Sequence, residues 1–143
     1  MTARAAAAAL ALAACAHGRL QTVPLLVSPD VLVDEPAATA RAQILRDALL
    51  SALRDEHYCL DRRGDFEAML QLRADVRGGD LLLVLTLDKG AGVRIEEVER
   101  RYPATPLPPT RERADSLVRP LLHELADSGE ARALAADVQP CVR

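Results

Sequence analysis

The chain has 143 residues, half of them apolar, which is enough for one globular domain with a hydrophobic core. Its formal net charge is −3, with acidic and basic residues mixed along the chain, so it lacks the basic surface that neutralises nucleic-acid phosphates. One phenylalanine and two tyrosines are its only aromatic residues, which leaves few rings to stack on bases or sugars. We therefore expect no nucleic-acid partner.

The N-terminus has the parts of an export signal. Arg4 supplies a positive charge, and the apolar run from Ala5 to Ala14 is too short to span a bilayer. Residues Leu12-Ala13-Ala14-Cys15 resemble the lipobox of bacterial lipoproteins, in which the chain is cut before a cysteine that becomes lipid-modified. The alternative is an ordinary secretory signal with an incidental cysteine.

The resemblance to lipoproteins implies a location in the cell. Residues 1–14 become the signal peptide, Cys15 carries the lipid, and residues 15–21 form a tether between the bilayer and the domain. Ala16 stands where lipoproteins of the inner membrane often carry aspartate, so the resemblance implies the outer membrane, with the domain facing the periplasm.

A domain over residues 22–128 begins with a buried strand and a helix. The run VPLLV at 23–27 predicts the strand, which Ser28-Pro29 ends. Between Glu35 and Glu56 the apolar residues recur with the period of an amphipathic helix, and Pro36 suits its first turn. A short strand around 57–60 follows.

A second helix is predicted to begin at Asp65, a good N-cap, with Phe66, Met69 and Leu70 on its inner side. Gly78-Gly79 ends that region.

The run DLLLVLTLD at 80–88 has no polar alternation, which predicts a central strand covered on both faces. The glycine-rich residues 89–92 predict a hairpin turn into an antiparallel partner over 93–102. In that partner the apolar phase changes between Ile95 and Val98, as at a bulge or an exposed edge.

A third helix follows the proline-rich segment 103–110. Its inward residues are predicted to be Leu117, Val118, Leu121, Leu122 and Leu125. Pro120 disfavours a helix interior, so we expect the regular helix to begin near Ser116, with the proline in its first turn. Residues 129–143 are predicted to form a short helix and a C-terminal tail.

The predicted order, β-α-β-α-β-β-α, indicates a single small α/β (α+β) domain with helices packed on a mixed sheet. Thioredoxin-like proteins share this order, but their C-x-x-C motif is absent where the first helix begins with DEPAAT. Residues 22–127 also resemble the small domain of lipoproteins that activate penicillin-binding proteins, of the curli secretion lipoprotein and of the Tol-Pal translocation protein. That resemblance rests on the order of elements around LRDEHYCLD and GGDLLLVLTLD, and it implies a non-enzymatic role in the envelope.

With Cys15 lipidated, the exported chain keeps two thiols, Cys59 and Cys141. In an oxidising periplasm the two can pair and fasten the C-terminal tail to the domain. The alternative is a buried Cys59 and a free Cys141.

Polar residues are densest at 55–61, where Asp55, Glu56, His57, Cys59 and Asp61 include types that bind metals. We interpret them as a solvated helix end beside a core cysteine and predict no catalytic residue, metal or cofactor. A small periplasmic enzyme or metal-binding protein that uses this cluster is the alternative function.

The strand over 93–102 carries charges of both signs beside a central strand that is too apolar to be exposed. We therefore predict that an envelope protein docks on this strand, and the candidate contact residues are Arg94, Glu97, Arg100 and Arg101. A solvated face with no partner is the alternative. The sequence thus predicts a lipid-anchored protein that presents a protein-binding domain in envelope assembly or regulation.

Overall fold

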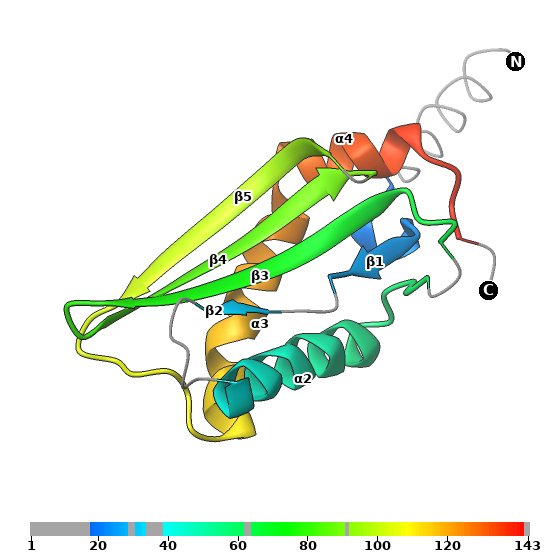
Figure 1. Ribbon diagram of the computed structural model, residues 1–143. Helices are drawn as coiled ribbons and strands as arrows, with labels where there is room; N and C mark the ends of the chain where they lie inside the picture. The colour runs from blue at the N-terminus through cyan, green and yellow to red at the C-terminus, as the bar shows by residue number, and fades with distance from the viewer. Residues whose placement is uncertain (1–17, 29–30, 34–38, 62–63, 91, 142–143) are drawn as a thin grey trace, which may run out of the picture.

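The computed structural model describes residues 18–28, 31–33, 39–61, 64–90 and 92–141. They form one α/β domain in which helices pack on one face of a mixed sheet (Figure 1). The predicted fold class is therefore confirmed. The predicted signal peptide, the lipobox and Pro36 lie outside the described residues.

The sheet has the strand order β1-β3-β4-β5, with β2 also paired to β3. Its two short strands run parallel to β3, whereas β3, β4 and β5 are antiparallel neighbours. The strands span Leu25–Val27 (β1), Leu32–Val33 (β2), Ala68–Arg77 (β3), Asp80–Lys89 (β4) and Val93–Tyr102 (β5).

The central position predicted for the strand at 80–88 is confirmed, because β4 pairs with β3 on one side and β5 on the other. The antiparallel pairing predicted for 93–102 is confirmed as well. There β5 is an edge strand, and its register shifts opposite Leu87 and Asp88, close to the expected change of phase.

The helix predicted from Asp65 is wrong, because β3 occupies this region. Phe66, Met69 and Leu70 have a helical spacing, but the longer alternation of Leu70, Leu72 and Ala74 with polar residues fits a strand that is buried on one side. Gly78 and Gly79, both with positive φ, form the two-residue turn into β4. Hydrogen bonding to β1 on one side and to β4 on the other therefore makes this segment a strand and not a helix.

The strand predicted around 57–60 is reduced to a single bridge between Leu60 and Leu25, and His57 has a positive φ in the turn that ends the preceding helix. The helices span Thr39–Asp55 (α2), Arg111–Asp127 (α3) and Gly129–Asp137 (α4).

Pro120 lies inside α3, not in its first turn as predicted. The helix begins at Arg111 because the Thr110 side chain accepts a hydrogen bond from the Arg113 amide, and Ala114 is already buried. Tertiary packing of the apolar stripe thus offsets the cost of an internal proline.

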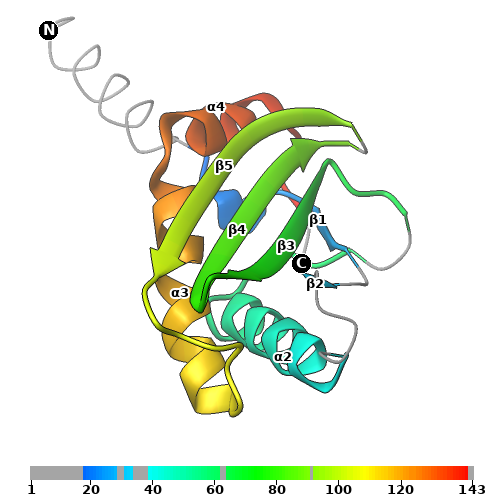
Figure 2. The ribbon, with the colours of Figure 1, turned by 60° about the vertical axis from the view of Figure 1, so that its left-hand side comes forward.

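In both ribbon views α3 passes behind the long strands, and α2 lies below the strands next to α3 (Figures 1 and 2). The inner residues of β4, namely Leu81, Leu83, Leu85 and Leu87, are fully buried against this layer. Of the described helices none is long and apolar enough to cross a membrane.

The fold begins earlier than the predicted boundary at residue 22. The short 3-10 helix η1 (Leu20–Thr22) lies against α4, and Leu20 is 1% exposed within the core. Gly18 also touches α4 closely, since a Cβ there would lie 2.3 Å from the Ala135 carbonyl oxygen. The predicted tether over 15–21 therefore loses its last residues to the domain.

Leu20→Ala should lower the free energy of unfolding by about 2–5 kcal/mol, because it leaves a cavity in the core. Urea unfolding measures the loss. Val93→Ala, at a site that is 63% exposed, is the control and should change stability by no more than about 0.5 kcal/mol. An equally small effect of Leu20→Ala would contradict the assignment of Leu20 to the core and would support the predicted tether over 15–21.

Candidate functional site

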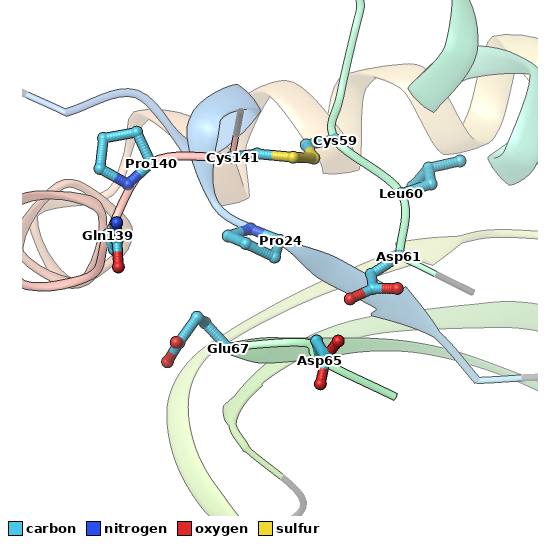
Figure 3. A pocket seen from close by; sticks show the side chains of 9 residues that line it. All are labelled: Pro24, Cys59, Leu60, Asp61, Asp65, Glu67, Gln139, Pro140 and Cys141. Atoms are coloured by element: carbon cyan, nitrogen blue, oxygen red, sulfur yellow. A yellow bond between two sulfur atoms is a disulfide. The ribbon is translucent and has the colours of Figure 1, made fainter. Parts of the chain in front are cut away.

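The two cysteines that the thiol count pairs are joined in the structure. Cys59 and Cys141 form a disulfide between residues 82 positions apart, with their Cα atoms separated by 6.4 Å. The Cys59 amide donates to the Gln21 carbonyl at 3.2 Å, and the Cys141 amide donates to the Thr22 carbonyl at 2.8 Å. The bridge therefore holds the segment after α2, the N-terminal segment and the C-terminal tail at one place (Figure 3).

Beside the disulfide lies an open hollow of about 400 Å³ (Figure 3). Three carboxylates, those of Asp61, Asp65 and Glu67, lie around Pro24 at its rim, and Gln139 and Pro140 line the opposite side. Within the described ranges, no three His, Cys, Asp or Glu residues are grouped so as to hold a metal ion. The hollow is thus an acidic depression beside the junction of residues 21–24 with the C-terminal tail.

The polar cluster at 55–61 is not brought together as one site. Asp55 bonds to Arg119 of α3 at 2.6 Å, and Glu56 meets His123 of the same helix at 2.6 Å. Cys59 is consumed by the disulfide. The two carboxylates therefore fasten the end of α2 to α3.

Arg119 lies at the centre of these contacts between α2 and α3. It also bonds to Asp115 at 2.8 Å, one turn earlier in α3. The hydrogen bonds to Asp115 and Asp55 raise the pKa of the Arg119 guanidinium above its usual value.

The four predicted contact residues of β5 fall on two faces of the sheet. Arg94, Glu97 and Arg101 point to the face without helices, because they lie opposite Asp88, Thr86 and Leu82 rather than opposite the core residues of β4. We call this side the open face. It is formed by the outward residues of β3, β4 and β5 together with Leu32 of β2.

Arg100 points the other way, to the helices, and bonds to Glu124 of α3 at 2.7 Å. This hydrogen bond raises the pKa of Arg100 above its usual value. Arg100 therefore joins β5 to α3 and does not lie on the open face with the other three residues.

Arg94 is held on the open face by two carboxylates. It bonds to Asp88 of β4 and to Glu97 of its own strand, each at 2.5 Å. The hydrogen bond to Asp88 raises the pKa of Arg94. On the same strand Arg101 lies 3.2 Å from Asp80.

The middle of the open face is more apolar than its rim. Val84 is 2% exposed although the described helices all lie on the other side of the sheet (Figure 2). Two small hollows, of about 230 Å³ and 80 Å³, flank it, one beside Leu82 and Arg101 and the other beside Arg73 and Thr86. Long charged side chains thus surround an apolar centre.

Arg73 and its strand also belong to this surface, although the sequence predicted a helix there. The signal that would have predicted the strand is an alternation of polar with apolar residues, which places the polar side chains on one face. The polar residues are Gln71, Arg73, Asp75 and Arg77.

No family model matches the sequence, and no curated protein matches it. Solved structures resemble it in fold. A point variant of PelC from Paraburkholderia phytofirmans, a dodecamer, is 13% identical, with 78% of this chain and 93% of that chain covered and a TM-score of 0.47.

Another structure of the PelC dodecamer from the same organism is 14% identical, with 78% and 94% covered and a TM-score of 0.43. A DUF330 protein from Xanthomonas campestris is 13% identical, with 85% of this chain and 89% of that chain covered and a TM-score of 0.43.

Reduction of the Cys59–Cys141 bridge should lower the free energy of unfolding by about 2–4 kcal/mol, because the reduced chain regains the entropy of a long open loop. Urea unfolding with and without reductant measures the difference, and the double variant Cys59→Ala, Cys141→Ala should show the same loss without reductant. Peptide mapping of the non-reduced protein should recover the two cysteines in one linked fragment. Two alkylatable thiols in freshly isolated protein would contradict the pairing.

Proposed function

We propose that this chain is an exported, lipid-anchored protein of the bacterial envelope, whose domain binds protein through the open face and has no catalytic role. The observation that carries the binding role is the open face itself, where Leu32, 47% exposed, lies beside the buried Val84 among charged side chains. Apolar centres with polar rims are typical of protein interfaces.

Two features support the export and the anchor. The disulfide between Cys59 and Cys141 is of the kind that persists in oxidising compartments such as the periplasm. The segment Leu12-Ala13-Ala14-Cys15 resembles a lipobox, and Gly18 already touches α4, so the anchor would lie only a few residues from the domain. An outer-membrane location facing the periplasm is part of the proposal.

We do not propose a metal site or an enzyme at 55–61. Asp55 and Glu56 already bond to Arg119 and His123, and Cys59 is in the disulfide. Three of the five groups on which that alternative function depends are thus occupied by structural contacts.

Cys15→Ser should abolish acyl labelling and release the chain from the membrane fraction, because serine cannot form the thioether to the lipid. The domain should still fold, since its described core begins at Leu20. Labelling with a fatty-acid analogue and membrane fractionation measure the two effects, with Ala16→Ser as the control that keeps the thiol. A Cys15→Ser chain that stays in the membrane with normal processing would contradict the anchor.

A photo-crosslinking residue at Glu97 should capture one defined protein in intact cells, because Glu97 lies exposed on the open face. Mass spectrometry of the adduct identifies the captured chain. The same probe at Glu130, exposed on α4, is the control and should not give that adduct. Equal capture from both positions, or none from Glu97, would argue against binding through the open face.

A further inference from the structure

We infer that the open face binds the open face of a second copy of this chain, about a twofold axis that runs along β4. The inference rests on the proposed function and deepens it by naming the protein that is bound. The pattern of charges across β3, β4 and β5 supports this pairing of two copies.

One row of residues crosses the open face at its centre. Arg73 of β3 lies opposite Val84 of β4, and Val84 lies opposite Glu99 of β5. Since neighbouring strands are about 4.8 Å apart, a cation and an anion stand roughly 10 Å apart on either side of the buried valine. Within the described part of the chain, neither Arg73 nor Glu99 forms an ion pair.

The next row has the opposite polarity, but both of its charges are already paired within the chain, Asp75 with Arg77 and Arg101 with Asp80. Asp75 of β3 lies opposite Leu82, which lies opposite Arg101 of β5. The two rows together place an apolar pair, Val84 and Leu82, between charges that differ in sign from one side of β4 to the other.

A twofold axis parallel to β4 stacks two such faces without a clash of charge in these rows. The rotation places β3 of one copy over β5 of the other and keeps each row at its own level. Arg73 then faces Glu99 of the second copy, whereas Asp75 (6% exposed) and Val84 (2% exposed) stay covered by side chains of their own copy. Each charged contact occurs twice, as in any isologous interface.

The other way of stacking two sheets is disfavoured. An axis that crosses the strands at this row would place each strand over its own copy, so that Arg73 would face Arg73 and Glu99 would face Glu99. Like charges at an interface suppress that arrangement. In the favoured arrangement the aspartates of β4 do face their own copies, but Asp88 is neutralised by Arg94 and Asp80 by Arg101.

The area is sufficient for a reversible dimer. The three ten-residue strands β3, β4 and β5 are about 33 Å long, and at about 4.8 Å per strand they occupy about 15 Å, so the face covers roughly 500 Å² in each copy. Two copies would then bury about 1,000 Å², near the lower limit for specific interfaces. Facing sheets pack about 10 Å apart, which leaves room for arginine and glutamate side chains to meet.

A charge exchange tests the inference. The full chain in density-matched detergent should sediment as a monomer–dimer equilibrium that weakens as salt is raised. Arg73→Glu and Glu99→Arg should each raise the dimer Kd at least about tenfold, because each brings like charges together twice. The combination of both substitutions should return Kd to within about threefold of the original, because it restores both pairs with their signs exchanged.

Arg111→Glu is the matched control. It makes the same change of charge as Arg73→Glu, but at the start of α3, in the helical layer, and should leave Kd unchanged. Circular dichroism verifies that each variant is folded.

A chain that stays monomeric up to about 100 µM, or a dimer whose Kd the double exchange fails to restore, would overturn the inference. Capture of a different protein from Glu97, with a monomeric chain, would overturn it as well, yet would leave the proposed function standing. Failure of the proposed function is seen separately, in the Cys15→Ser fractionation and in the loss of any adduct from Glu97.

Discussion

The domain depends on one contact, the burial of the inner face of β4 against the helical layer. Leu81, Leu83, Leu85 and Leu87 are each fully buried, and a buried leucine contributes about 1.5–3 kcal/mol through the hydrophobic effect. Because β4 pairs with β3 and β5 along their lengths, its position fixes theirs, and α3 lies against both β4 and β5. The sheet, the helices and the surface that remains uncovered all follow from this burial.

Since the described helices use only one side of the sheet, the opposite side must be compatible with water. Its rim carries Arg73, Glu97 and Glu99, which are exposed, whereas the central Val84 is shielded by the side chains around it. An antiparallel sheet with one wet face normally alternates apolar and polar residues, but β4 keeps apolar residues on both faces. That departure is what makes the open face a candidate for protein binding.

Two groups of charged residues differ in whether the fold itself uses them. Arg119, His123 and Arg100 are used inside the fold, where they join α2 and β5 to α3. Arg73 and Glu99 lie on the open face without such partners in the described part of the chain. A surface whose charges are of both signs and are ordered in rows favours a partner with the same order, which a copy of the chain supplies.

The elements with a local signal could be predicted from the amino-acid sequence: the apolar run that makes β4 central, the change of phase that marks β5 as an edge, and the stripes of α2 and α3. The sequence also predicted three open-face residues, Arg94, Glu97 and Arg101, because charge on an edge strand is visible in one dimension. The strand at 68–77 and the contact of Arg100 with Glu124 could not be predicted in this way, since both depend on which distant residues lie alongside. The number of thiols predicted the pair Cys59 and Cys141. Their proximity, however, arises because α4 packs against η1, and contacts between residues so far apart in the chain cannot be predicted from a local sequence pattern.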